Sequence, residues 1–432
     1  MVCYRPRNVL ELMQTDHFEI AVTTADRRVD VRRSAQAQPG EPSMSFQLLS
    51  PRVMLVGGGT VRETASVLRR LGLSRPLVVT DPFMVASGLV RRCLEPLAAA
   101  GIAASVFGDT VADPTDSVVQ AGVGVLRAGD YDCLIGFGGG SSIDTAKAMA
   151  LLALGDAPMR AYKVPASPDH AALPVIAIPT TAGTGSEATR ATVITDTERG
   201  EKMLIMGLGC MPLAAIVDYE LTYTLPPRIT ADTGIDSLTH ALEAYVSRRA
   251  NPVSDAWALT AMALIGANLR TAYAEPRNAA AREAMMLGAT LGGLAFSNAS
   301  VALVHGMSRP IGAHFHVPHG LSNAMLLPAV TRFSIGEAPA RYATAARTIG
   351  FAADGADDET ACGKLADGLA ALNADLAVPT PRAYGIDPAE WEAKLELMAS
   401  QALASGSPGN NPRVPDAAEI VALYRVVYSA NA

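Results

Sequence analysis

Cysteine is scarce in this sequence, and the few cysteines are scattered. There are five in 432 residues, with no CxxC spacing among them, so neither a disulfide framework nor a thiolate metal site is expected. No apolar run reaches the roughly 18 residues that a membrane span requires, and the first twenty residues lack the apolar core of a signal peptide. The sequence therefore predicts a cytoplasmic protein without a membrane partner.

Positive charge is also in short supply. The chain carries 35 Lys and Arg against 42 Asp and Glu, a net charge of −7. Proteins that bind nucleic acid usually leave a basic footprint, so this balance argues against such a partner. Hydrophobic residues make up 49% of the chain and charged residues 18%, which is typical of a well-packed globular enzyme with a small-molecule substrate.

Three segments of the chain differ in pattern. Residues 1–43 include the polar, aperiodic stretch ADRRVDVRRSAQAQPGEPS, which predicts a flexible N-terminal extension. Residues 44–225 alternate short β-type runs with helical ones, which predicts an α/β domain with a parallel sheet covered on both faces. Residues 226–432 show only helical patterns, which predict an all-helical domain. A cleft between these two domains is the default place for a site.

The α/β pattern predicts individual strands and helices. The expected strands are RPLVVTD (75–81), IAASVFGD (102–109), YDCLIGFGG (131–139) and LPVIAIPTT (173–181), and the expected helices cover residues 85–101, 116–129 and 141–155.

A glycine-rich turn joins one of these strands to a helix. Gly138, Gly139, Gly140 and Ser141 lie between the strand that ends near 138 and the helix that follows. Such a turn lets the backbone approach a pyrophosphate, and the helix N-terminus supplies free N–H groups and a positive dipole end. The turn is not GxGxxG, so the dinucleotide fingerprint does not strictly apply. A tight structural turn is the alternative.

Two further features strengthen the case for a nucleotide. Small hydroxyl residues alternate with glycine in PTTAGTGSEAT (179–189), including Thr180, Thr181 and Thr184, and can donate to phosphate, ribose or amide groups. Asp81 ends the first well-defined strand, where a carboxylate can accept from ribose hydroxyls. Its charge would repel a 2′-phosphate, which favours NAD over NADP. The alternative role for Asp81 is a helix cap.

A carboxylate and an imidazole are separated by one helical turn in ADTGIDSLTHALEAYV (231–246). Asp236 and His240 are four residues apart and therefore share one face of a helix. By themselves they could form a surface pair, a helix-stabilising pair or half of a metal site.

Four of the seven histidines fall within residues 303–320. His305 and His319 are separated by 14 positions, about 21 Å along a straight helix, so both could reach one ion only if the chain reverses between them. His314 and His316 could be ligands instead, and the spacing does not choose. One Asp with three His forms an N/O set that suits Fe(II), Zn, Mn, Co or Ni.

Taken together, these pieces resemble the iron-containing (group III) alcohol dehydrogenase family, from about residue 50 to the end. The motifs that carry the resemblance are GGGSSIDTAK, PTTAGTGSEAT, IVDYELTYTLPP, TGIDSLTHALEAY, AFSNASVALVHGM and VPHGLSNAMLLP. The resemblance implies a dehydroquinate-synthase-like, dinucleotide-binding α/β domain followed by a helical domain. It also implies an NAD(H)-linked alcohol dehydrogenase or aldehyde reductase that uses a divalent metal, with Fe(II) first and Zn or Mn as alternatives. A homodimer or higher homo-oligomer is expected.

The resemblance also implies roles for single residues. Asp236, His240, His305 and His319 fall where the family's metal ligands stand, and Phe296 falls where the family lines its substrate channel. The residues implied to contact the cofactor are Gly138, Gly139, Gly140, Ser141, Asp144, Thr180, Thr181, Thr184 and Lys202, beside Asp81 from the reasoning above.

Two positions depart from the family pattern. Members commonly carry a histidine four residues after the one matching His305, where this chain has Arg309. Arg190 stands where smaller or apolar residues are usual. Because a guanidinium can hold an acidic group with two N–H donors, these residues suggest a substrate that bears an anion. The alternative is that one or both point to acidic neighbours or to solvent.

Other activities remain open at this stage. A hydroxyacid–oxoacid transhydrogenase, or a lyase of the dehydroquinate-synthase type, would be built on the same fold. A non-catalytic protein that binds nucleotide or metal is the alternative from another class.

Overall fold

The computed structural model describes residues 23–24, 27–28, 45–155 and 157–429. Most of the predicted extension, residues 1–43, lies outside the described residues. The part of it that is described consists of two paired two-residue strands, β1 (Thr23–Thr24) and β2 (Arg27–Arg28). The chain from Ser43 to Ala432 forms one unit by its contacts.

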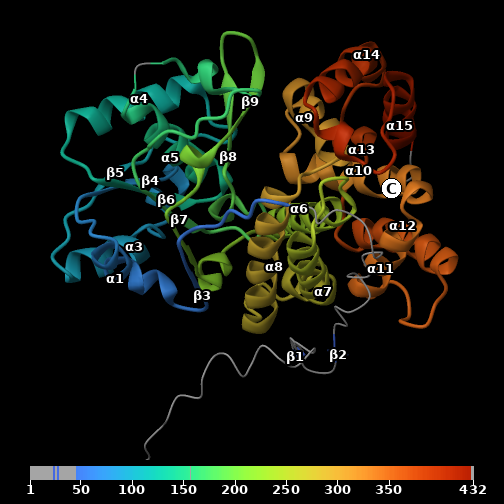
Figure 1. Ribbon diagram of the computed structural model, residues 1–432, viewed down its shortest axis with the longest axis horizontal. Helices are drawn as coiled ribbons and strands as arrows, with labels where there is room; N and C mark the ends of the chain where they lie inside the picture. The colour runs from blue at the N-terminus through green and yellow to red at the C-terminus, as the bar shows by residue number, and fades with distance from the viewer. Residues whose placement is uncertain (1–22, 25–26, 29–44, 156, 430–432) are drawn as a thin grey trace, which may run out of the picture. The chain divides into compact units, whose positions relative to one another are not determined.

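A six-stranded sheet is the centre of the α/β part, and all its neighbouring strands are parallel (Figure 1). The four strands expected from the sequence are confirmed as β4 to β7. In spatial order the strands are β3 (Val53–Val56), β10 (Ala214–Val217), β7 (Val175–Pro179), β6 (Cys133–Gly138), β4 (Pro76–Val79) and β5 (Ser105–Phe107).

Alternating side chains give the sheet two buried faces. Successive residues of a strand point to opposite sides: Val78 and Ile135 pack on one layer of helices, whereas Leu77 and Leu134 pack on the other. Both faces are covered, which is why these strands consist almost entirely of apolar residues. The first layer contains α1 (Thr64–Arg70) and α3 (Arg91–Ala99), and the second contains α4 (Asp116–Ala128) and α5 (Gly140–Ala153).

The structure differs from the sequence expectations in this part, where α1 and β10 were also not among the expected elements. The helix expected over 85–101 is interrupted at Gly88, whose φ of 75° is left-handed, so that α2 (Pro82–Ala86) and α3 are separate. An antiparallel hairpin, β8 (Ala191–Asp196) and β9 (Glu201–Met206), was not expected. Its inner side chains, such as Ile194 and Met203, pack against α5.

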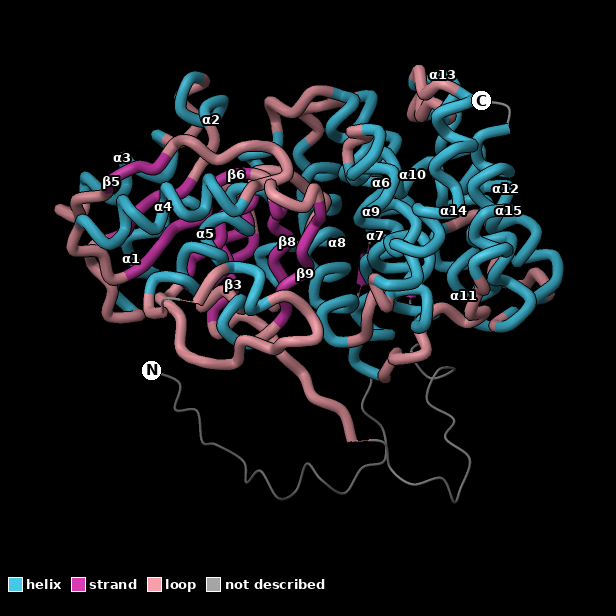
Figure 2. The backbone as a smooth tube through the Cα atoms, turned by 90° about the horizontal axis from the view of Figure 1, so that it is seen from above, coloured by secondary structure: helices cyan, strands magenta, loops and turns pink. Residues whose placement is uncertain are grey.

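Helices alone follow β10 among the described residues, as expected, and the first, α6 (Pro227–Val246), is almost entirely buried after its first turn. In Figure 2 the strands of the sheet lie on one side and these helices on the other. The predicted division into domains near residue 225 stays a prediction. The other helices are α7 (Pro252–Ala274), α8 (Ala279–Asn298), α9 (Leu303–Phe315), α10 (His319–Ser334), α11 (Pro339–Ile349), α12 (Asp358–Asp375), α13 (Pro381–Tyr384), α14 (Pro388–Ala404) and α15 (Ala417–Ser429).

The sequence explains where several helices begin. Asn251 and Ser254 form a capping box at the start of α7, where Pro252 occupies the first turn. Thr115 caps α4 by accepting a hydrogen bond from the Val118 N–H. In the described part of the chain no single helix is long and apolar enough to cross a membrane, and only α8 and α9 taken together, with a bend of 103° between them, pass a test of length and composition.

Candidate active site

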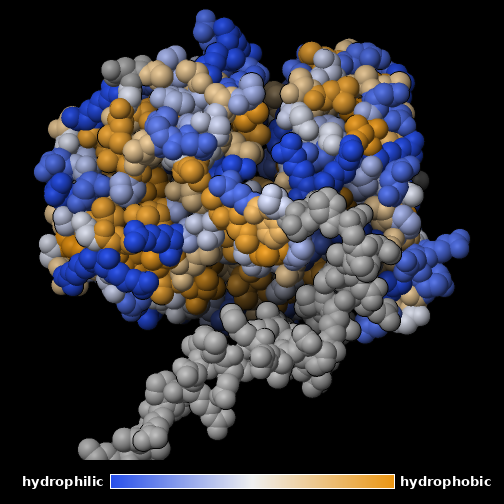
Figure 3. Space-filling view, in the orientation of Figure 1, coloured by the Kyte–Doolittle hydropathy of each residue, from blue (hydrophilic) through white to orange (hydrophobic). Residues whose placement is uncertain are grey.

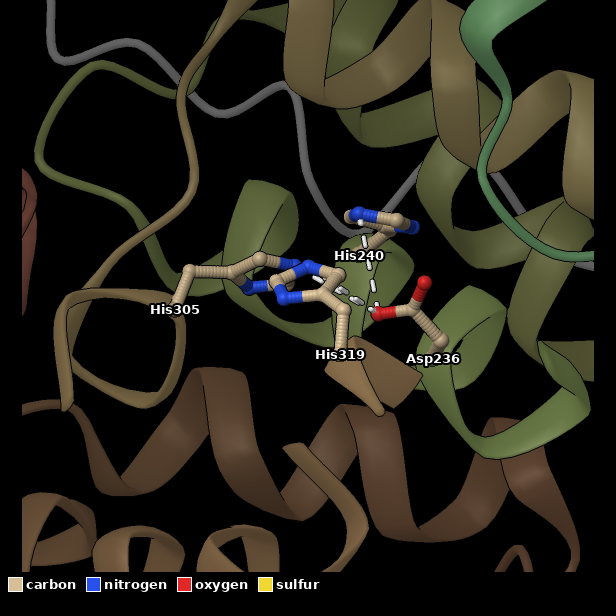
Figure 4. Close-up of side chains that lie close together, drawn as sticks. All are labelled: Asp236, His240, His305 and His319. Carbon is tan, nitrogen blue, oxygen red and sulfur yellow. Dashed lines mark ion pairs between the residues drawn. The ribbon is translucent and has the colours of Figure 1, made fainter. Parts of the chain in front are cut away.

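Four side chains from three helices meet inside the helical part. Asp236 and His240 come from α6, His305 from α9 and His319 from the first residue of α10. One ligand atom of each lies within 4.8 Å of the ligand atoms of all the others, and the side chains point toward a common centre (Figure 4). The sequence prediction that these four residues come together is thus met by the geometry.

The local chain path explains how His319 reaches His305. The helix α9 ends at Phe315, the next residue His316 has a left-handed φ of 55°, and Pro318 precedes α10. The chain therefore reverses. Gly320 then lets α10 approach α6, because a Cβ there would lie 2.5 Å from the carbonyl oxygen of Asp232. The reversal that the sequence required is built from these residues.

Burial and charge set the protonation of the cluster. Asp236 and His240 are only 2% and 4% exposed, which excludes the surface pair. Burial alone would raise the pKa of Asp236, but the three surrounding imidazoles hold it well below its usual range. Burial lowers the pKa of His240 to about 4 and that of His319 to about 3. At neutral pH the cluster therefore presents a carboxylate and two neutral rings, the forms that bind metals.

His305 is oriented by a residue that sequence reasoning missed. Its Nδ1 lies 2.7 Å from Oε2 of Glu243. The same carboxylate accepts hydrogen bonds at the start of α9, from the Ala302 N–H at Oε2 and from the Val304 N–H at Oε1. Burial pulls the pKa of His305 down, but the carboxylates of Asp236 and Glu243 outweigh it and raise that pKa. Because Nδ1 is engaged, Nε2 faces the cluster.

The donor set fits a divalent cation. One carboxylate with three imidazoles is a set that Fe(II), Zn and Mn accept. The amide of Asn323 marks the point on which the donors converge: its Nδ2 lies 2.6 Å from Oδ1 of Asp236, 3.1 Å from Nε2 of His305 and 3.2 Å from Nε2 of His319. The acceptor atoms of Asp236, His305 and His319 are thus directed at one buried point, as the ligands of a bound cation are.

The two remaining histidines of this region lie elsewhere. The Nε2 of His314 lies 2.8 Å from Oε1 of Gln401, and His316 is exposed at the end of α9. Neither belongs to the cluster found among the described residues. The alternative that His314 or His316 supplies ligands is therefore wrong.

The glycine-rich turn and its neighbours gather at the carboxyl ends of three adjacent strands. Asp81 follows β4, Gly138 ends β6 and Thr180 follows β7, the edge at which open α/β sheets bind ligands. A Cβ on Gly138 would lie 2.5 Å from Oγ of Ser142, and its φ of 148° also favours glycine. Gly139 precedes α5 and lies beside Thr181.

Buried hydroxyl groups without hydrogen-bond partners make this edge of the sheet suitable for binding a nucleotide. The hydroxyls of Thr180 and Thr181 are buried without a hydrogen-bond partner in the described structure, next to the N-terminus of α5. Asp81 caps α2 by accepting from the Met84 N–H at 2.9 Å, so the helix-cap alternative is observed. Its other oxygen faces the turn, 3.5 Å from Oγ of Ser142.

Buried charges hold the loop between β7 and β8 in place. Asp144 accepts from the hydroxyl of Ser186 and from the N–H of Val193, so both of its oxygens are used within the protein. Lys147 is fully buried and donates to the carbonyl oxygens of Ser186, Thr189 and Ala191. Lys147 is a second residue that sequence reasoning did not single out.

A cavity of about 390 Å³ joins the cluster of one aspartate and three histidines to the turn at α5. This volume is typical of small-molecule sites. Phe296 lines it and stacks on the ring of His240, with centroids 4.3 Å apart, and the Nζ of Lys202 forms an ion pair with Asp113 at 2.7 Å. The predicted site residues that line the cavity are Gly140, Ser141, Asp144, Thr184, Arg190, Lys202, Asp236, His240, Phe296, His305, Arg309 and His319.

Comparisons with known proteins identify the family. Residues 51–219 match the model of the iron-containing alcohol dehydrogenases, and residues 230–428 match the model of the C-terminal part of that family. The chain belongs to the iron-containing alcohol dehydrogenase family.

Individual relatives agree over nearly the whole chain. The NAD-dependent methanol dehydrogenase of Bacillus methanolicus is 35% identical over 376 residues, covering 87% of this chain and 98% of the relative. The structure of a 1,3-propanediol oxidoreductase has a TM-score of 0.85 at 35% identity, covering 89% of this chain and 100% of that one. A sulfoacetaldehyde reductase from Bifidobacterium kashiwanohense, solved in complex with NAD+, has a TM-score of 0.81 at 30% identity, covering 90% and 100%.

These findings confirm the predicted family, the fold class and an oxidoreductase of the iron-containing alcohol dehydrogenase type. The roles of the individual residues remain predictions.

Proposed function

We propose that the protein interconverts a small primary alcohol and its aldehyde, with NAD(H) as the hydride carrier and one divalent ion, Fe(II) first, per chain. One observation carries this proposal: a single cavity joins the Asp236, His240, His305 and His319 cluster to the glycine turn at α5. A protein that only bound a nucleotide or a metal would not need both to open into one space.

Within this proposal the residues divide into two groups. The four clustered side chains would hold the ion, with Glu243 orienting His305. In a bound state the ion supplies Lewis acidity toward the substrate oxygen, and the nicotinamide carries the hydride. The residues proposed to bind the cofactor are Asp81, Gly138, Gly139, Gly140, Ser141, Thr180, Thr181, Thr184 and Lys202, with Asp144 and Lys147 fixing the loop beside it.

The chain's own contribution to the reaction is positioning and exclusion of water. Phe296 packs on the ring of His240 and lines the cavity, so it would narrow the space in which a substrate carbon meets the nicotinamide. The neutral rings of His240 and His319 leave Asp236 as the main negative charge of the cluster. Holding reactants in a fixed geometry within such a cavity is worth several orders of magnitude in rate.

The direct test is an aldehyde-reduction screen on protein of defined metal content, followed by the absorbance of NADH. We expect NADH to be consumed in proportion to the aldehyde reduced. A transhydrogenase would instead turn over with an added oxoacid and no net loss of NADH, and a lyase would release product without consuming the cofactor. Either result would overturn the proposal.

Asp81 provides a prediction about the choice of cofactor. Replacing Asp81 with Asn keeps an oxygen that can cap α2 but removes the charge that opposes a 2′-phosphate. The preference for NADH over NADPH should then fall by roughly 10-fold, measured as the ratio of kcat/KM for the two cofactors. A wild-type protein that used NADPH better than NADH would contradict this role.

We also propose a cytoplasmic homo-oligomer, most simply a homodimer. Phe46 and Leu48, just before the edge strand β3, are 45% and 44% exposed, and hydrophobic residues gather over the α/β part on the face drawn in Figure 3. Light scattering on the purified protein would test the assembly, since a monomer at all concentrations would contradict it. Cell fractionation would test the location.

A further inference from the structure

Three arginine side chains line the cavity beside the metal cluster. Arg190 lies just before β8, Arg249 lies in the loop between α6 and α7, and Arg309 lies on α9. Arg309 follows His305 by one helical turn, a rise of roughly 6 Å, so the two positions are separated by about the length of a short substrate. The sequence pointed to Arg190 and Arg309, whereas Arg249 emerges only from the fold.

No described carboxylate neutralises these arginines. None of the three forms an ion pair within the part of the chain that the structure describes. Arg309 donates one hydrogen bond, to Oγ of Ser407 at 2.9 Å, and the Nε of Arg190 is buried without a partner. The carboxylates of Glu243 and Asp169 interact electrostatically with Arg309 and Arg190, respectively, but neither forms an ion pair with its arginine in the described structure. The alternative that Arg190 and Arg309 are paired with acidic neighbours is therefore not what the structure contains.

The charge balance of the cavity favours an anion at this end. Lys202 is matched by Asp113, and the carboxylate of Asp144 is used by the loop. Burial lowers the pKa of Arg309, but a guanidinium stays charged at neutral pH because its pKa starts above 12. A cation removed from water without a counter-charge is unfavourable, so an anion that enters this space is attracted more strongly than in solvent.

A short helical turn holds two of the arginine-bearing segments in place. The 3-10 turn η9 (Ser407–Asn410) supplies the hydroxyl that accepts from Arg309. Asn410 donates to Oγ of Ser300 at 2.8 Å, and its carbonyl oxygen accepts from the N–H of Arg248 at 2.8 Å. The loop that carries Arg249 is therefore tied to the same turn that positions Arg309.

We propose that the cavity selects a short aldehyde or alcohol that carries an anionic group at the end remote from the reacting carbon, and that Arg309, Arg190 and Arg249 bind this group. A carboxylate, a sulfonate and a phosphonate share the necessary chemistry, since each offers two or more oxygens to guanidinium N–H donors. The inference rests on the proposed reductase activity and names its substrate class.

The test compares four aldehydes of the same length with NADH: propanal, 3-oxopropanoate, sulfoacetaldehyde and phosphonoacetaldehyde. We expect at least one of the three anions to exceed neutral propanal in kcat/KM by about 10- to 100-fold, the value of a charge-assisted bidentate contact. Arg309→Ala should remove most of this preference while changing propanal reduction far less. Equal kcat/KM for all four aldehydes, unchanged by the substitution, would overturn the inference.

A neighbouring pair of arginines supplies the matched control. Arg248 and Arg249 are both exposed in the loop that follows α6, so neither Arg248→Ala nor Arg249→Ala should disturb the core. Of these two arginines only Arg249 lines the cavity. Arg249→Ala should therefore lower kcat/KM for the preferred anion, whereas Arg248→Ala should not. If Arg309→Ala failed to fold, this pair would still decide, because equal effects of the two substitutions would count against the proposal.

A binding measurement separates this inference from the proposed function. Calorimetry with the corresponding alcohols, isethionate, 3-hydroxypropanoate, 2-hydroxyethylphosphonate and neutral 1-propanol, requires no turnover. Binding of an anion that is at least 10-fold tighter than 1-propanol and depends on Arg249 and Arg309 supports the site, even if no aldehyde were reduced and the reductase proposal failed. Reduction of propanal without any such binding would leave the reductase standing and remove the anion site.

Discussion

Replacing His319 with alanine should leave the protein folded and lower its activity by about 1000-fold, the equivalent of roughly 4 kcal/mol of transition-state stabilisation. The side chain of His319 is 38% exposed, more than the other three of the cluster, so its removal leaves no large cavity. It contributes one of only three imidazoles, and a set reduced to Asp236, His240 and His305 should hold a divalent ion weakly. Elemental analysis and thermal unfolding, run on the same sample, measure the two effects separately.

His314 provides the control for this substitution. It lies on α9 between His305 and His319 in sequence, but its ring contacts Gln401 rather than the cluster. His314→Ala should therefore retain both metal and activity. Full metal occupancy in His319→Ala would show that the cluster is not the metal site.

Spacing predicts part of this site, and the family resemblance is what selects His305 and His319 over His314 and His316. Asp236 and His240 share a helix face, and the reversal needed between His305 and His319 is visible in the Pro and Gly residues there. Glu243 could have been found in the same way, since it lies one turn after His240 on the same stripe of α6. Asn323 follows His319 by four residues, and this spacing also carries it to the cluster.

The local sequence pattern could not predict that the polar residues of α6 and Lys147 are buried. After its first turn the helix α6 is almost entirely buried, so its polar residues do not mark a solvent-facing stripe. A periodic pattern separates inside from outside only when a helix has an exposed face. The same limit applies to Lys147, whose charge suggests a surface position although five acceptor contacts hold it inside.

Long-range contacts account for the remaining misses. The hairpin β8–β9 is short and half-buried, and β8 directly follows the polar loop. The polar residues of that loop make the alternation of buried and exposed side chains in β8 hard to recognise in the sequence. Arg249 stands in a loop whose course depends on η9, more than 150 residues later, through the Arg248 to Asn410 hydrogen bond. No local pattern encodes such a contact.

Replacing Lys147 with methionine should lower the free energy of unfolding by about 3–5 kcal/mol. Methionine fills a similar volume but donates nothing, so the buried carbonyl oxygens of Ser186, Thr189 and Ala191 lose their donor. Burial lowers the pKa of Lys147, and the negative charges of Asp144 and Glu187 act in the opposite direction. Without the ammonium these two buried carboxylates lose that favourable electrostatic interaction.

The same substitution should also weaken cofactor binding, because Lys147 holds the loop from Ser186 to Ala191 against α5. Urea unfolding and KM for NADH would be compared with those of Lys364→Met, which removes an exposed lysine from α12 and should change neither. A lower unfolding midpoint with a raised KM for NADH identifies Lys147 as a positioning residue for this loop. If Lys147→Met matched Lys364→Met in both measurements, the buried ammonium would have no such role.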